Sequence, residues 1–145
     1  MKRLAGLLVC LGAVLVLTAG CSKQGRKLGQ LSGKVTFKGK PVPAGYVSFT
    51  PDGSGGNLGN VKVAQIKDGF FDTSVESDPG ILPGPTIIRI AGFDGKKLKG
   101  FSQGKQIFNP HEVRFTVPEG TSTQDFDVPN SAANNLIITP TSDEP

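Results

Sequence analysis

The sequence predicts an all-β protein, folded as an antiparallel Greek-key β-sandwich of about 7–8 short strands. Glycine and proline account for 31 of the 145 residues, 20 Gly and 11 Pro, which is typical of many tight turns and unlike a helical bundle. Several segments alternate apolar and polar residues with a period of two, as half-buried strands do. No ten-residue segment after Cys21 has the periodicity of a helix.

The first half of the chain contains four predicted strands, which cover residues 31–38, 46–50, 61–67 and 70–75. Asp68-Gly69, between the last two, is a hairpin signal because both central positions of such a turn need a positive φ. Residues 52–60 hold four glycines, and we expect a mobile turn there. This loop lacks the alternating acids of a calcium loop and the Gly-Lys-Ser/Thr ending of a phosphate loop.

The second half of the chain continues the pattern. Strands are predicted at 86–91, 113–117 and 126–128, and 136–139 is compatible with a last one. Pro118-Glu119-Gly120 should turn the chain between the strands at 113–117 and 126–128. Phe49 and Phe71 should fill the core of the sandwich, which has no Trp. Of the three aromatic residues Phe93, Phe101 and Phe108, we expect at least two to pack into the rim.

The N-terminus has the parts of a secretory signal peptide, which we place at residues 1–20. Lys2 and Arg3 precede 17 uncharged, mostly apolar residues from Leu4 to Gly20, and small residues end the segment. The alternative is an uncleaved membrane anchor, because 17 residues is the short limit for crossing a bilayer.

The segment Leu17-Thr18-Ala19-Gly20-Cys21 resembles the lipobox of bacterial lipoproteins, although Thr18 stands where Leu is most common. The resemblance implies that Cys21 receives a diacylglyceryl group and becomes the first residue of the mature protein. Two or more acyl chains anchor a protein stably, whereas one holds weakly. By the family's sorting rule, Ser22 in place of Asp favours the outer membrane, with the domain facing the periplasm or the cell surface. Cys10 would leave with the signal peptide, so no intramolecular disulfide is expected.

Residues 21–30 are interpreted as the lipidated cysteine and a flexible spacer, 31–140 as the β-domain, and 141–145 as a polar tail. The spacer's three cations are either solvated or attracted to anionic head groups, at about 1 kcal/mol each near a charged surface. Loss of Lys2 and Arg3 lowers the net charge from +4 to +2. Because no dense run of Lys or Arg remains, nucleic-acid binding is not expected.

Three motifs of the β-domain resemble carboxypeptidase regulatory-like domains. Residues 33–49 contain the family's opening glycine, its Gly-Lys-Pro turn at 39–41 and a strand that ends in Phe49. Residues 67–71 resemble its Asp-Gly-x-Phe hairpin, and 80–84 its Gly-Leu-x-Pro-Gly turn. The resemblance implies the transthyretin-like fold, an immunoglobulin-like sandwich, and a non-catalytic role. The Tyr that usually follows the Pro-Gly is missing, because Pro85 and Thr86 stand there.

Few residues suggest catalysis. His111, the only histidine, sits in a loop before a predicted strand, where a solvated or capping role is the usual one. Asp125 and Asp127 should lie on one face of a strand, towards solvent, and glycosidase chemistry needs two carboxylates across a cleft. We therefore expect no enzymatic activity, no cofactor and no metal site.

The irregular stretch 93–108 carries the one concentration of charge outside the spacer, formed by Lys96, Lys97, Lys99 and Lys105. These lysines either keep a solvated loop soluble or contact anionic polysaccharide, lipopolysaccharide or an envelope protein. The sequence thus favours a membrane-anchored lipoprotein of the cell envelope whose β-sandwich is a binding or structural module. The alternatives are a small-ligand transport protein of the transthyretin-like type and, third, an enzyme.

Overall fold

The computed structural model of the chain describes residues 27–75, 80–97, 99–100 and 102–135. Cys21 and the rest of the lipobox-like segment, Phe101, the segment 136–139 and the tail 141–145 lie outside the described residues. Within the described part, no helix is long and apolar enough to cross a membrane.

The described residues fold as an all-β structure. Its nine strands are β1 Gly29–Phe37, β2 Lys40–Pro41, β3 Ala44–Pro51, β4 Lys62–Lys67, β5 Phe70–Asp72, β6 Gly84–Phe93, β7 His111–Val117, β8 Gly120–Thr123 and β9 Phe126–Val128. Two short 3-10 helices, η1 Gly53–Gly55 and η2 Asn130–Asn135, complete the described elements, and none of these is an α-helix. The predicted all-β class is therefore confirmed.

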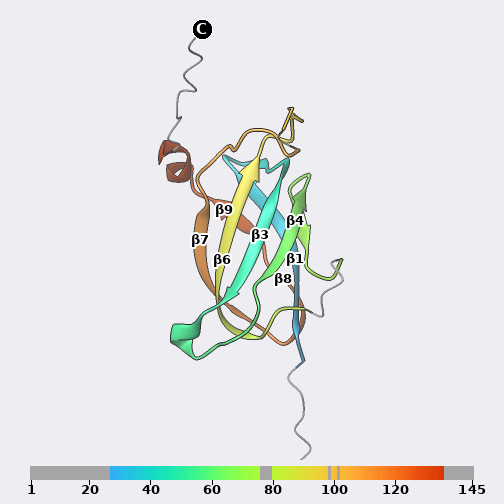
Figure 1. The fold of residues 1–145 in the computed structure, drawn as a ribbon, viewed down its shortest axis with the longest axis vertical. Helices are drawn as coiled ribbons and strands as arrows, with labels where there is room; N and C mark the ends of the chain where they lie inside the picture. The colour runs from blue at the N-terminus through green and yellow to red at the C-terminus, as the bar shows by residue number, and fades with distance from the viewer. Residues whose placement is uncertain (1–26, 76–79, 98, 101, 136–145) are drawn as a thin grey trace, which may run out of the picture.

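The strands form one curled sheet in the order β2-β1-β5-β4-β3-β6-β7 (Figure 1). All pairs along this path are antiparallel. Both β2 and β5 pair along one edge of β1, at different points of its length. Along the opposite edge, β1 pairs in parallel with β8 and then with β9. The sheet is therefore mostly antiparallel, with a parallel seam where the last strands join the first.

This seam differs from the closing turn that the sequence predicts. Pro118 and Glu119 do turn the chain, but β8 and β9 pair with β1 instead of returning along β7. The strand β8 has the sequence Gly-Thr-Ser-Thr and β2 has only two residues, so neither gives the apolar alternation that marks a strand. Both were missed for that reason.

Two hairpins have the same kind of two-residue turn. Lys38-Gly39 joins β1 to β2 with φ values of 52° and 70°, and Asp68-Gly69 joins β4 to β5 with 51° and 78°. Positive φ at both positions matches the right-handed twist of the flanking strands. The hairpin predicted at Asp68-Gly69 is confirmed.

The core lies inside the curl and is rich in aromatic and β-branched side chains. Phe49 and Phe71 are buried as predicted, with ring centroids 6.0 Å apart, and Phe71 lies 5.7 Å from Phe126 of β9. Val117 of β7 and Val128 of β9, from opposite ends of the strand path, belong to the same core. The sheet therefore curls until its two edges share one interior.

The β8–β9 connection crosses β1 where β1 has a glycine. A Cβ on Gly33 would lie 2.0 Å from the carbonyl oxygen of Gln124, so any side chain would collide with backbone. Just beyond this crossing, Asp125 accepts a hydrogen bond from the Lys34 N–H and Asp127 accepts one from the Thr36 hydroxyl, both 2.7 Å. The two aspartates are exposed, as predicted, and they fasten the last strand to the first.

The domain has two ends, which we call upper and lower as they stand in Figure 1. The upper end carries the β1–β2 and β4–β5 turns, the long β6–β7 loop and η2. The lower end carries the start of β1, the β3–β4 and β5–β6 connections and the β7–β8 turn. The lysine-rich stretch and the start of the domain therefore lie at opposite ends.

Candidate functional site

The lysine-rich loop joins β6 to β7 and is organised around the Asp94 carboxylate. One oxygen of Asp94 accepts hydrogen bonds from the backbone N–H of Lys96 and of Lys105, both 3.0 Å. The Asp94 N–H donates to the carbonyl of Lys105 at 2.9 Å, and the Gly95 N–H donates to that of Gln103 at 3.0 Å. The loop therefore has a defined base, where the two halves of the chain pair.

The surroundings of Asp94 favour its charged form. The N–H of Lys96 has the largest effect in holding the pKa of the Asp94 carboxyl below its ordinary 3.8, followed by the N–H of Lys105 and by both lysine charges, against an opposing effect of burial. Gly104 lies against this carboxylate, with φ of 87°, and a Cβ there would be 2.0 Å from the Asp94 oxygen. This packing explains why a glycine stands at position 104.

Aromatic residues hold the loop onto the sheet. Phe108 is fully buried with its ring 4.9 Å from that of Phe37, and a Cβ on Gly92 would lie 2.3 Å from it. Phe93 is half-buried, with its ring 6.3 Å from that of Tyr46. Of the aromatic residues expected at the rim, Phe108 is therefore part of the core, whereas Phe93 lies half-buried against the exposed Tyr46.

The four lysines predicted as a surface, Lys96, Lys97, Lys99 and Lys105, are all exposed on this loop. Three lysines that the prediction left out lie on neighbouring turns of the upper end: Lys38, Lys40 and Lys67. They are distant in sequence from the loop, and only the sheet order brings them near. In the sequence, only the turn dipeptides Lys38-Gly39 and Asp68-Gly69 could have indicated that Lys38 and Lys67 lie at the ends of hairpins.

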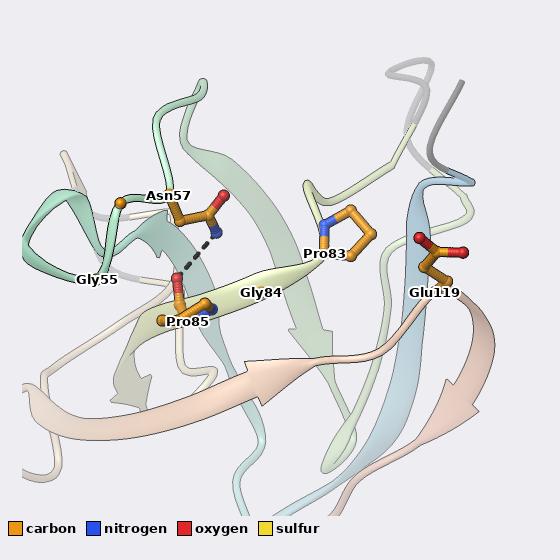
Figure 2. Close-up of a pocket in the computed structure, with 7 residues that line it drawn as sticks. Gly55, Asn57, Pro83, Gly84, Pro85 and Glu119 are labelled. Atoms are coloured by element: carbon orange, nitrogen blue, oxygen red, sulfur yellow. Dashed lines mark hydrogen bonds between the residues drawn. The ribbon is translucent and has the colours of Figure 1, made fainter. Parts of the chain in front are cut away.

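A hollow of about 380 Å³ opens at the lower end, between η1, the start of β6 and the β7–β8 turn (Figure 2). It is lined by Gly55, Gly56, Asn57, Pro83, Gly84, Pro85 and Glu119. Asn57 is 5% exposed, and its side-chain amide N–H donates to the Pro85 carbonyl at 2.9 Å. Its amide oxygen and the Glu119 carboxylate are hydrogen-bond acceptors at this hollow.

The glycine-rich loop beside the hollow forms a capped 3-10 turn, where we expected a mobile turn. Asp52 is the N-cap of η1, and its carboxylate accepts from the Ser54 N–H at 3.0 Å and the Ser54 hydroxyl at 2.6 Å. The Ser54 hydroxyl has the largest effect in lowering the pKa of Asp52, and the Arg114 guanidinium, 3.6 Å away, lowers it further. The glycines thus form a capped turn that walls the hollow.

The residues weighed for catalysis are spread over the fold. His111 begins β7 and is half-buried, with its backbone opposite Ile90 of β6. Asp125 and Asp127 bind the β1 strand, as described above. Among the described residues, no group of three His, Cys, Asp or Glu side chains is placed to hold a metal ion.

Comparisons of the chain with protein-family models, with curated proteins and with solved structures found no match.

Proposed function

We propose that this chain is a lipoprotein of the cell envelope, tethered through Cys21, whose β-domain is a non-catalytic binding module. The lipobox-like segment and the charged spacer support the tether. The loop that carries Lys96, Lys97, Lys99 and Lys105 is the face that meets the partner, an envelope protein or an anionic polysaccharide. The proposal includes an outer-membrane location, which Ser22 favours.

The direction of β1 is the observation that carries this proposal. The strand starts at Gly29 at the lower end, next to the spacer, and ends at Phe37 at the upper end. The eight steps between its nine residues, at about 3.3 Å each, separate the two ends by about 25 Å. A domain tethered through its N-terminal spacer would therefore hold the lysine loop on the side away from the membrane.

We further propose that the curled sheet is a transthyretin-like Greek-key sandwich. Support comes from the shared interior of β7 and β9 and from the burial of Phe49, which ends the opening motif. The parallel seam of β8 and β9 with β1 is a departure from a purely antiparallel sandwich. In this proposal the fold presents loops and brings no active site with it.

The tether is tested by replacing Cys21. In bacteria that express the full chain, Cys21→Ser should abolish incorporation of labelled palmitate and either release the protein from membranes or leave the signal peptide uncut. Cys10→Ser is the matched control and should change neither result. Unchanged membrane attachment of the Cys21→Ser variant, with cleavage at another position, would overturn the lipid anchor.

The outer-membrane location is tested at the next residue. In a two-membrane host, Ser22→Asp should move the protein from the outer-membrane to the inner-membrane fraction while its palmitate labelling stays unchanged. Ser22→Thr is the control that keeps an uncharged residue. Identical fractionation of the aspartate and threonine variants would contradict sorting by this position.

The lower hollow favours a second candidate function, the binding of a small molecule. A volume of about 380 Å³ suits a small organic ligand, and the acceptors Asn57 and Glu119 would suit one that carries hydroxyl or amino groups. A screen of sugars and small amines by thermal shift, with Glu119→Gln as the test variant, addresses it. A shift that depends on Glu119 would favour transport of a small ligand over the module proposed first.

A further inference from the structure

We propose that the upper end is one continuous cationic surface of seven lysines, built to bind an extended anionic polysaccharide. Its members are Lys38, Lys40, Lys67, Lys96, Lys97, Lys99 and Lys105, and all are exposed. This inference rests on the proposed binding role of the β6–β7 loop and names its ligand class. It also extends the surface to two hairpins that the sequence did not connect with the loop.

The backbone at Val42, Pro43 and Ala44 brings the three lysine-bearing segments together. Ala44 of β3 lies between Lys67 of β4 and Phe93 of β6 in the sheet. The carbonyls of Pro43 and Val42 accept hydrogen bonds, 3.0 and 2.8 Å long, from the β4–β5 turn. The β4–β5 turn and the base of the β6–β7 loop therefore flank the same connection.

The third segment, the β1–β2 hairpin, joins at the same connection. Val42 also donates its N–H to the Val35 carbonyl at 3.0 Å, next to the β1–β2 hairpin that carries Lys38 and Lys40. A Cβ on Gly95 would lie 3.3 Å from the Pro43 side chain, so the β6–β7 loop packs on it. The lysines of all three turns therefore surround one short stretch of backbone.

Two carboxylates oppose the seven lysines on the described turns, so most of the positive charge of this surface is left over. On its described turns, the acidic residues are Asp68 and Asp94, and Asp94 is directed at backbone N–H groups. Further along the strands, Glu112 lies 3.7 Å from Arg89 and Asp127 accepts from the Thr36 hydroxyl. The net charge of +2 without Lys2 and Arg3 thus conceals a strong concentration of positive charge at one end.

The chemistry of this end favours a polysaccharide over a protein partner. Stable protein interfaces are enriched in exposed aromatic residues and Arg and depleted in Lys. Here the described turns carry lysines and no Arg, and Phe37 and Phe108 beneath them are 9% and 0% exposed. Phe70, which pairs with Lys67 beside the β4–β5 turn, is the exposed aromatic residue at this end, at 49%. Separate, flexible ammonium groups on three turns match the repeating charges of a long anion more closely than one compact anion.

The geometry also disfavours the membrane of the anchor as the ligand. The surface lies about 25 Å from the start of β1, measured by the length of that strand. Exposed charges are largely screened beyond about 8 Å at physiological salt. An anionic polymer that extends from the envelope could reach this end, whereas the head groups would be screened from it as long as the start of β1 faces the membrane.

The test measures binding of the full, detergent-solubilised chain to polygalacturonate, with neutral dextran as the control polymer. The variant replaces Lys38, Lys40 and Lys67 by Gln and leaves the β6–β7 loop intact. The control variant replaces Lys27, Arg89 and Arg114 by Gln and makes the same change in net charge.

We expect the Lys variant to lose at least tenfold in affinity and to have a weaker salt dependence, because each contacting lysine releases counterions. The control variant should stay within about twofold of the parent.

Three outcomes would overturn the inference. One is equal loss in the two variants, which would mean that net charge alone decides. Another is loss only when Lys96, Lys97, Lys99 and Lys105 are replaced, which would leave the loop of the proposed function standing without the wider surface. The third is binding to vesicles of anionic phospholipid but not to polygalacturonate. Membrane attachment in the Cys21→Ser experiment reports on the anchor independently of all three.

Discussion

At each end of the domain, one oxygen of an aspartate accepts two hydrogen bonds. The two aspartates differ in how far apart in the sequence the groups are that they connect. At the lower end, Asp52 bonds the N–H and hydroxyl of Ser54, only two residues away. At the upper end, Asp94 bonds the N–H groups of Lys96 and Lys105, the second of them eleven residues away. Asp52 therefore shapes a turn, whereas Asp94 closes a long loop.

The two carboxylates also differ in what they do to nearby cations. The side chain of Arg114 lies 3.6 Å from Asp52, so positive charge at the lower end faces a carboxylate. Asp94 is directed at backbone N–H groups, and although the charges of Lys96 and Lys105 also lower its pKa, the two lysine side chains are exposed. The comparison suggests that one acidic residue can order a basic loop while leaving its lysine side chains towards solvent.

The largest expected effect comes from filling the space beside Asp94. Gly104→Ala would place a Cβ 2.0 Å from the Asp94 oxygen and 2.6 Å from the Lys96 carbonyl oxygen. We expect a loss of about 3 kcal/mol in the free energy of unfolding, because backbone atoms must move. Urea denaturation of the variant and the parent chain measures it.

Gly100→Ala is the matched control in the same loop. Its φ is 88°, close to that of Gly104, but nothing lies within 4 Å of its added Cβ. It should cost only about 1 kcal/mol, from the left-handed backbone conformation. Equal losses at the two positions would contradict a loop that is packed around Asp94.

The next effect compares the two aspartates directly. Asp94→Ala should raise the hydrogen-exchange rate of amides along 95–105, because the bond that closes the loop is lost. Asp52→Ala should raise it only around η1, since its bonds are local. Exchange measured by mass spectrometry on the two variants separates these outcomes. An equally local change in both variants would contradict the claim that Asp94 holds a long loop closed whereas Asp52 shapes only a turn.

Much of the fold was predictable because its signals are local. Turn dipeptides such as Asp68-Gly69 and the alternation in β1, β3 and β7 each depend on residues close in sequence. The seam of β8 with β1 depends on which edges meet after the sheet curls, and nothing in Gly-Thr-Ser-Thr encodes that. The facing of β4 was also not predictable: Lys62 is buried at 3% exposure while Val63 is 47% exposed, because the register with β3 fixes which residues face inward.

Only those lysines of the candidate site that are close together in the sequence could be predicted. A run of lysines in 93–108 is visible in the sequence, and Lys96 and Lys105 are on the exposed loop that it predicts. The role of Asp94 was missed, because one Asp before a Gly looks like any turn residue. Lys67 was missed because it belongs to this end only through the pairing of β4 with β3. Long-range pairing, which the sequence does not display, joins the pieces of the surface.

The smallest expected effect is the acid dependence of the two ends. The pKa of Asp94 is lowered, first by the Lys96 N–H, so its ionised form stabilises the fold above the ordinary 3.8 of an unfolded aspartate. That contribution is lost only as the pH falls through the lower pKa of the folded state. The loop should therefore keep its structure at pH 4 and lose it only as the pH falls through the lowered pKa of Asp94 in the folded state.

The pKa of Asp52 is lowered too, so acid should weaken the hydrogen bonds that both carboxylates accept. The two ends should differ in how many residues this change affects. Amide shifts in NMR spectra of the full chain, followed from about pH 5 to about pH 2, should move at Lys96 and Lys105 together with one midpoint. At the lower end the Ser54 amide should move, with no partner at long range. In an Asp94→Asn variant, the shared midpoint of Lys96 and Lys105 should vanish while that of Ser54 persists. Separate midpoints for the two lysine amides in the parent chain would mean that one carboxylate does not hold both halves of the loop.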